Sequence, residues 1–300
     1  MDEKISNFSQ VASLRRYVLS EGKERGVEVI DCDNGKLRFL LNVTKALDIM
    51  QIYHEGENVS FVSKNGFSTS DKTFAKRFEG GALYTCGLDG VGSVENVELH
   101  GTFHNIPARV LSCSCNEDGI RVEAIIEDSE LFGKHLVVKR KITSKVCSNS
   151  VQVEDELINL GDSDEQYCLL YHVNLGYPFL DEGVTVNGKI RDVEPRTKWA
   201  EINQKDYNVM GKAVPNAEET CYFLSLDEPY IEVENAKLKK KVRLDFSSSF
   251  TEFVLWKSTR SNDYAMGIEP STTKLDSHFK YLGIKRGESK KFSMNFSVIR

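Results

Sequence analysis

The sequence lacks the long apolar segments that cross membranes. No window of its 300 residues approaches the ~18 consecutive apolar residues of a spanning helix. Its first residues, MDEKISNFSQ, are polar and begin with acidic side chains, unlike the apolar core of a signal peptide. We therefore expect a cytoplasmic protein that has no membrane partner.

Positive charge is also scarce. The chain has 39 Lys and Arg against 45 Asp and Glu, which gives a formal net charge of −6. The one basic run, KLKKKVR at residues 237–243, alternates with strand-forming residues and is typical of a solvated strand face. A protein without a basic field has little to hold phosphates, so we expect no nucleic-acid partner.

Cysteine is not arranged for metal binding or for a disulfide framework. The seven cysteines are odd in number and scattered, and no C-x-x-C occurs. They are interpreted as reduced thiols. Cys113 and Cys115 lie two residues apart on a predicted strand and share one face, so they are interpreted as small apolar fillers.

Helical patterns are few. Asn7 or Ser9 is a suitable cap for a helix over residues 11–22, which would end at Gly22. Elsewhere apolar and polar residues alternate over long segments, as at 134–146 and 150–161. This period of two predicts long antiparallel strands with one face in water. The fold class is therefore mainly β, a large antiparallel sandwich with a short N-terminal helix.

Turn residues indicate how the strands connect. Residues 106–128 predict a hairpin with Gly119 at the turn, and Asn187-Gly188 is the preferred two-residue hairpin turn. No linker or change in composition divides the chain. We expect one domain over residues 1–300, on which residues 1–35 pack as an extension.

Two polar residues stand out in apolar strand patterns. His172 lies within CLLYHVNLGYPFL, and Glu269 follows AMGI directly before Pro270, at an expected strand end. Each has an ordinary interpretation: a core histidine with satisfied ring nitrogens, and a strand-end carboxylate in water. The functional interpretation is an acid and a base on separate strands, suited to a reaction in which one proton enters as another leaves.

Other chemistries have weaker support. His100 and His104 have the spacing of a helical zinc pair, but Gly101 and the following NIPA favour a strand or turn, and no third ligand is evident. No G-x-S-x-G occurs, and the glycine-rich residues 80–92 precede no helical pattern that would cradle a phosphate. We expect no metal and no cofactor.

Four segments in order resemble the galactose mutarotase-like superfamily of aldose 1-epimerases, and within it the DUF4432-type branch. They are GGALYTCGLDGVG, ELHG, YHVNLGYP and LWKSTRSNDYAMGIEP, and with their flanks they span about residues 76–273. The resemblance implies a β-supersandwich with a sugar cleft on its concave face. It also implies a cofactor-independent isomerase whose partner is a small carbohydrate.

The resemblance also implies roles for single residues. His172 would protonate the ring oxygen of the sugar, and Glu269 would remove the proton of the anomeric hydroxyl. His100 would hydrogen-bond near the ring oxygen, and Arg77 would bind hydroxyls. By position alone, Asn105 and Asn174 are further candidates for orienting hydroxyls. Candidates for an apolar wall are Tyr84, Tyr171, Tyr177 and Trp256. The family's substrate-binding aspartate has no clear counterpart, and Asp181 and Asp192 are the candidates.

Three functions remain open at this point. The first is a mutarotase acting on a free sugar, which the acid and base favour because pure binding does not require both. The second is a carbohydrate-binding protein without turnover. The third is a mutarotase for a sugar phosphate or acid sugar, which requires extra cations in the cleft; the candidates are Arg77, Arg109, Arg191 and Arg196. The sequence is compatible with a homo-oligomer.

Overall fold

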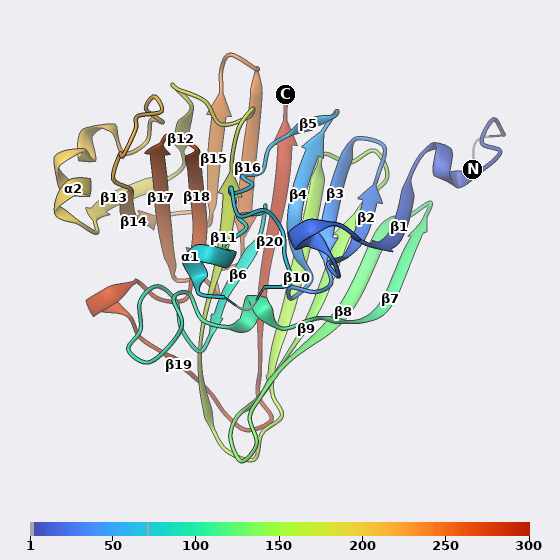
Figure 1. The fold of residues 1–300 in the computed structure, drawn as a ribbon, viewed down its shortest axis with the longest axis horizontal. Coiled ribbons are helices and arrows are strands. Elements are labelled where there is room, and N and C mark those ends of the chain that lie inside the picture. Colours follow the sequence, from blue (N-terminus) through green and yellow to red (C-terminus); the bar gives the residue numbers. More distant parts are fainter. Residues whose placement is uncertain (1–2, 71) are drawn as a thin grey trace.

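Three antiparallel sheets make up the computed structural model, which describes residues 3–70 and 72–300 (Figure 1). The first sheet has the order β1-β2-β3-β4-β5, with β1 Ser13–Val18, β2 Glu28–Asp33, β3 Leu37–Asn42, β4 Asp48–His54 and β5 Glu57–Asn58. The second has the order β12-β15-β16-β20-β10-β9-β8-β7, with β12 Thr185–Asn187, β15 Tyr230–Asn235, β16 Lys240–Phe246, β20 Ser289–Ile299, β10 Ser150–Asn159, β9 His135–Ser144, β8 Gly119–Ser129 and β7 Arg109–Asn116.

The third sheet carries the strands on which the candidate residues lie. Its order is β13-β14-β17-β18-β11-β19, with β13 Ile190–Pro195, β14 Thr220–Leu226, β17 Glu252–Arg260, β18 Asp263–Ser271, β11 Glu165–Leu175 and β19 Leu282–Ile284. Strand β6, Tyr84–Leu88, also pairs with β11. The helices are short: α1 Phe74–Arg77, α2 Lys198–Ile202 and 3-10 turns at Phe8–Gln10, Gly22–Glu24, Phe103–Asn105, Gln204–Asp206 and Asp276–His278.

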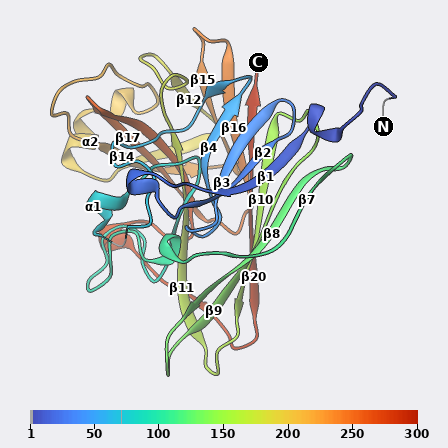
Figure 2. The same ribbon diagram turned by 45° about the vertical axis from the view of Figure 1, so that its right-hand side comes forward.

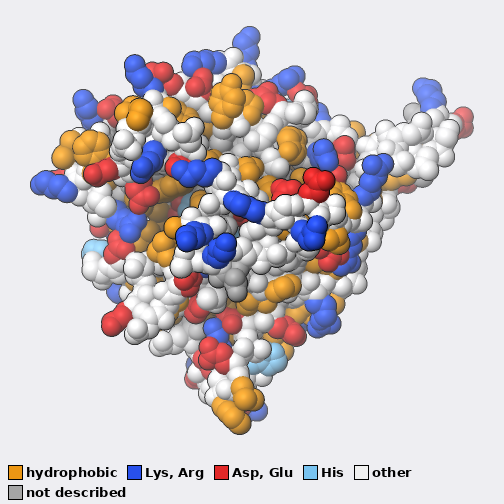
Figure 3. Space-filling view, in the orientation of Figure 1, with side chains coloured by type: hydrophobic (Ala, Val, Ile, Leu, Met, Phe, Trp, Pro, Cys, Tyr) orange, Lys and Arg blue, Asp and Glu red, His pale blue; other side chains and the backbone are white. Residues whose placement is uncertain are grey.

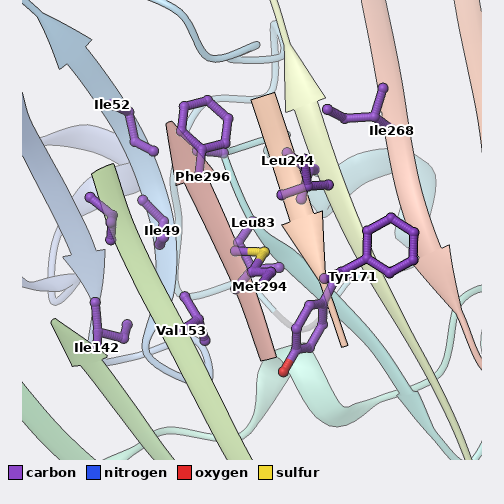
Figure 4. Packing of buried hydrophobic residues seen from close by; sticks show 14 of the residues in the cluster. Ile49, Ile52, Leu83, Ile142, Val153, Tyr171, Leu244, Ile268, Met294 and Phe296 are labelled. Carbon is purple, nitrogen blue, oxygen red and sulfur yellow. The ribbon is translucent and has the colours of Figure 1, made fainter. Parts of the chain in front are cut away.

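The sheets share one hydrophobic core. Figure 4 shows Ile49 from β4, Met294 and Phe296 from β20 and Ile268 from β18 converging in it, and all four are buried. In Figures 1 and 2 the long strands β8, β9, β10 and β20 run to the lower tip, and α2 lies on the opposite side from the N-terminus. Within the described ranges, no helix has the length and apolarity needed to cross a membrane.

The long alternating segments do form strands, as predicted. Strands β9 and β10 pair in antiparallel register, and β7 and β8 form the predicted hairpin, with Gly119 at its turn. In β10 the buried positions alternate with less buried ones, so Val151 and Val153 point into the core. The period-two pattern of β10 therefore reflects one buried face and one less buried face.

The N-terminal prediction needs correction. Asn7 does cap a helix, accepting from Ser9 N–H at 2.9 Å, but that helix is only one 3-10 turn. Residues 13–18, expected to be helical, form edge strand β1 instead. Leu14 packs against the core, and Arg16 forms an ion pair with Glu28 on the neighbouring strand. Pairing across strands has overridden the local helical pattern.

Two further predictions were wrong. Asn187-Gly188 joins β12 to β13, which belong to different sheets, so no hairpin forms there. Turn residues indicate that the chain bends, and the pairing of the flanking strands is decided elsewhere. Cys113 is exposed on edge strand β7, while Cys115 is half-buried against the core. The filler interpretation therefore fails for Cys113.

The basic run at residues 237–243 is only partly a solvated face. Lys240 is buried, and its Nζ lies 2.7 Å from a Glu57 carboxylate oxygen. Lys241 and Arg243 lie across the strand from Glu232, which both contact. Each of these basic side chains therefore has an acidic neighbour within the protein.

A buried arginine ties the sheets together. Arg140 on β9 donates to both carboxylate oxygens of Asp155, at 2.9 and 2.7 Å, and to Asp48 at 2.5 Å. The Tyr171 hydroxyl donates to Asp155 at 2.5 Å. Tyr171 precedes His172 in β11, and successive strand residues point to opposite faces. This network therefore anchors the rear face of the strand that carries His172.

We predict that Arg140→Met lowers the free energy of unfolding by about 3–5 kcal/mol, because Asp48 and Asp155 would remain buried without their cation. Urea unfolding measures the loss. Arg191→Met is the matched control, since Arg191 pairs with Asp227 at an exposed site and such pairs contribute about 1 kcal/mol or less. Equal losses in the two variants would contradict the account.

Candidate functional site

A cavity of about 370 Å³ brings together residues from distant parts of the chain. His172 on β11 and Glu269 on β18 form part of its lining, and Trp256 on β17 and His100 from the 89–102 loop line it as well. The further lining side chains are mostly apolar: Phe61, Phe74, Ala75, Phe78, Leu99, Cys221, Val254 and Leu275. Figure 3 shows a hollow between the regions that Figure 1 labels α1 and α2.

His172 and Glu269 meet because their strands are neighbours. β11 and β18 pair in antiparallel register with Val173 opposite Ile268, so the residues that flank this pair also face each other. His172 Nε2 lies 3.3 Å from Glu269 Oε1, and the two side chains are 6% and 2% exposed. His172 Nδ1 and Glu269 Oε1 have no hydrogen-bond partner in the protein. Buried polar atoms without a partner that lie at a cavity are candidates for contact with a ligand.

The environment moves the pKa values of the pair in opposite directions. Burial lowers the pKa of His172 well below 6.5, and the nearby His100 lowers it further. Burial raises the pKa of Glu269 well above 4.5; Glu219 adds to this, and Arg196 opposes it. At neutral pH the imidazole is therefore neutral, and burial favours the protonated form of the carboxyl. This neutral pair carries one titratable proton.

Gly267 makes room for this contact. A Cβ atom at residue 267 would overlap Glu269 Oε1 and would lie 3.1 Å from His172 Cε1. Residues 267 and 269 share one face of β18, so the Glu269 side chain lies back over the glycine. Any larger residue at this position would displace the carboxyl group from the imidazole.

His100 presents a second histidine ring at the cavity. Its backbone is left-handed, with φ +65, and its Nδ1 accepts a hydrogen bond from Gly92 N–H at 3.3 Å. Burial, followed by Arg196 and Arg77, lowers the pKa of His100 to about 4. The ring is therefore neutral with its proton on Nε2, which makes Nε2 a donor. Its centroid lies 5.6 Å from that of His172.

Trp256 provides an aromatic wall. Its ring meets His172 edge to face at a centroid distance of 5.6 Å. Its indole Nε1 donates to Glu219 at 2.8 Å, which holds the ring in place. A fixed aromatic surface beside polar groups is the usual composition of a small-molecule pocket.

Three predicted substrate-binding residues do not line the cavity. Arg77 is buried behind it, donating to the Tyr84 hydroxyl at 3.0 Å. Asn105 accepts from Lys45 Nζ at 2.8 Å. Asn174 donates to the backbone oxygens of His172 and Gly81, at 2.8 and 3.0 Å. Asn174 therefore supports the His172 backbone from within the protein, and contact with a substrate is not its evident role.

Most of the remaining candidates also lie elsewhere. Tyr171 is in the core and Tyr84 stacks on His104 at 3.7 Å, whereas Tyr177 is exposed on the surface. The others outside the cavity are Asp181, paired with Lys237; Asp192, exposed on β13; Arg109, paired with Glu127; and Arg191, paired with Asp227. Of the four candidate arginines, Arg196 alone lines the cavity.

The possible zinc pair does not converge. His100 faces the cavity, whereas His104 is buried with its Nδ1 2.6 Å from Asp48 Oδ2. In the part of the chain that the structure describes, no three His, Cys, Asp or Glu side chains are grouped to hold a metal ion. His104 instead belongs to the polar network around Asp48 and Arg140.

Several lining residues were not predicted from the sequence, although the strand pattern indicates some of them. Val254 lies two residues before Trp256 on β17, so strand alternation places both on one face. Cys221 on β14 lies opposite Trp256 in the register. Phe74 and Phe78 had no such signal, because α1 is only four residues long and carries no periodic pattern.

Comparison with known proteins identifies the type of fold. The family described as "Domain of unknown function (DUF4432)" matches residues 24–298. No curated protein matches the sequence. A solved structure from Klebsiella pneumoniae subsp. pneumoniae, described as a "putative aldose 1-epimerase", has a TM-score of 0.85 at 20% identity, and the match covers 96% of this chain and 83% of that one.

A second solved structure shows the same architecture. A galactose mutarotase-like protein from Clostridium acetobutylicum has a TM-score of 0.73 at 14% identity, with 97% of this chain and 99% of that one covered. Likeness at these identities shows the fold, which is a galactose mutarotase-like sandwich. The predicted fold class is thus confirmed, and the match of residues 24–298 agrees with the predicted DUF4432 branch.

The raised pKa of Glu269 predicts a stability effect. Because the folded-state pKa lies above the unfolded value, the wild type loses stability as pH rises from 4.5 towards the folded-state pKa, at about 1.4 kcal/mol for each pH unit. Glu269→Gln removes this loss. We therefore expect the variant to gain stability over the wild type, and this gain to be larger at about pH 8 than at about pH 5. Urea midpoints at both pH values measure the difference.

Glu228→Gln is the matched control, since it makes the same side-chain replacement at an exposed site. It should follow the wild type at both pH values. A Glu269→Gln variant that also follows the wild type would show that burial does not destabilise the Glu269 carboxylate.

Proposed function

The chain belongs to the DUF4432 family, and from this and the geometry of its cavity we propose that it is an isomerase of the aldose 1-epimerase type. It would interconvert the anomers of a free sugar or a simple sugar derivative. The observation that carries the proposal is the contact of His172 with Glu269, two buried titratable groups 3.3 Å apart in the lining of one cavity. The mutarotase-like fold adds support.

The reaction consists of two proton transfers and one bond change. Glu269, as the carboxylate, takes the proton of the anomeric hydroxyl, while His172, as the imidazolium, gives a proton to the ring oxygen. The bond between the anomeric carbon and the ring oxygen breaks, which leaves an aldehyde. Rotation about the bond to the carbonyl carbon is followed by ring closure with both transfers reversed. Each transfer partner contributes about 10²–10⁴-fold.

Burial of the pair favours ring opening in particular. Opening converts a carboxylate and an imidazolium into a carboxylic acid and a neutral imidazole. The same neutral pair is the form that burial favours in the free protein, given the pKa directions of His172 and Glu269. A cavity that excludes water therefore stabilises the state in which the two charges have disappeared.

Other lining residues hold the sugar. His100 Nε2–H is a hydrogen-bond donor near the imidazole of His172, as the T-shaped ring contact places it. Trp256 offers a flat apolar surface against which the C–H face of a sugar ring can pack. The His100 Nε2–H donor and the Trp256 ring thus orient the sugar beside the two residues that transfer protons.

We predict that the protein accelerates anomer exchange of at least one aldose, measured by NMR on the purified chain. His172→Ala and Glu269→Gln should each lower this acceleration by about 10²-fold or more, because each removes one proton carrier. Wild-type rates in either variant would contradict the assigned role. Sugar binding without any acceleration would instead indicate a carbohydrate-binding protein.

Gly267→Ala tests whether the position of the Glu269 carboxyl matters, because this change removes neither His172 nor Glu269. The added methyl displaces the Glu269 carboxyl, so exchange should slow while the thermal midpoint changes little. Gly283→Ala is the control, because a Cβ there meets no atom within 4 Å and should leave both readouts unchanged.

We further predict that the acid limb of the pH profile of kcat/KM lies below pH 6.5. The active pair holds one proton. A second proton binds only below pH 6.5, because burial and His100 lower the pKa of His172. The last proton leaves only well above pH 4.5, because burial and Glu219 raise the pKa of Glu269 against Arg196. After subtraction of the uncatalysed rate, an acid limb centred above 6.5 would contradict this assignment.

A further inference from the structure

The cations at the cavity are already occupied by carboxylates. Arg196 donates to Asp276 through Nε at 2.6 Å and through Nη2 at 3.0 Å. Its Nη1 lies 4.0 Å from Glu219. Lys64, at the rim, pairs with Asp263 at 2.7 Å. Among the described residues that line the cavity, these two are the lysines and arginines.

The lining therefore has no surplus of positive charge. Glu219 and Asp263 match Lys64 and Arg196 in number, and Asp276 adds a further carboxylate beside Arg196. His100 and His172 add no positive charge at neutral pH, because burial keeps both neutral. Figure 3 shows basic and acidic side chains interspersed on the face that contains the hollow.

Building on the proposed function, we propose that the cavity selects uncharged aldoses and excludes sugar phosphates and acid sugars, and that Asp276 enforces this choice by occupying Arg196. The guanidinium fork of arginine suits a bidentate phosphate or carboxylate. Asp276 already accepts from two of its nitrogens. The position where an anionic substrate group would bind is thus filled by the protein's own carboxylate.

An anionic sugar would incur two costs in this cavity. Its charged group would lose water without gaining an unpaired cation, which is strongly unfavourable. Its charge would also act on Glu269 as Glu219 does, making the carboxylate form harder to reach. A neutral sugar incurs neither cost, and the apolar walls formed by Phe61, Phe78 and Trp256 suit it.

The test uses matched sugars that differ at carbon 6, where the group is either neutral or anionic: galactose and glucose, their 6-phosphates, and the corresponding uronic acids. Anomer exchange and ligand binding are both measured by NMR. For the wild type we expect exchange and binding with a neutral member and neither with its anionic partners. An anionic sugar that exchanges as fast as its neutral partner would overturn the proposal.

Asp276→Asn should admit anions by freeing Arg196. We expect the ratio of anionic to neutral kcat/KM, or of the binding constants, to rise about tenfold or more. Adding Arg196→Gln should remove that gain. Asp227→Asn is the control, because it makes the same change in net charge at an exposed pair with Arg191. A ratio that changes equally little in Asp276→Asn and in the control would overturn the assignment.

The two measurements separate this proposal from the function on which it rests. Binding of neutral sugars alone, without exchange, would overturn the isomerase and support the charge selection. Exchange of anionic sugars would support the isomerase and overturn the charge selection. Failure of every sugar to bind would overturn both.

Discussion

The placement of an imidazole and a carboxyl group against each other in a buried site is the constraint on which the rest of the site depends. Neither group has enough partners to satisfy it there, since His172 Nδ1 and Glu269 Oε1 remain without hydrogen bonds. The protein holds them together through two neighbouring strands and through Gly267, whose missing Cβ leaves space for the carboxyl. Burial is unfavourable for the charged form of each group, and it therefore sets the protonation state of the pair.

The two faces of β11 make different contacts, one with the cavity and the other with the core. On one face, His172 points to the cavity, with Asn174 two residues later supporting its backbone oxygen. On the other face, Tyr171 donates to Asp155 within the Arg140 network. A strand fixed from behind by charged hydrogen bonds can hold an unsatisfied imidazole in a defined place. The polar core is thus a support for the site as much as a part of the fold.

The strands and the central pair could be predicted from the sequence because both depend on local contrast. Period-two patterns identify strands such as β9 and β10, and His172 and Glu269 stand out as polar residues in apolar surroundings. The aromatic lining from α1 could not be predicted, since Phe74 and Phe78 come from one short helical turn whose rings contact His100 and His172, residues far along the chain. The same holds for residues 13–18, whose conformation is decided by pairing with β2. Both features depend on contacts between residues far apart in the sequence, which local patterns do not contain.

The protonation of His172 is the most direct test of the account. Nitrogen-15 NMR of the histidine rings, with His172→Ala to assign the signal, reports the charge and tautomer of this one side chain. The account predicts a neutral ring at neutral pH in the free protein, a pKa well below 6.5, and a changed signal when a substrate sugar is added. An imidazolium at neutral pH, or a ring that does not respond to any sugar that undergoes exchange, would contradict it.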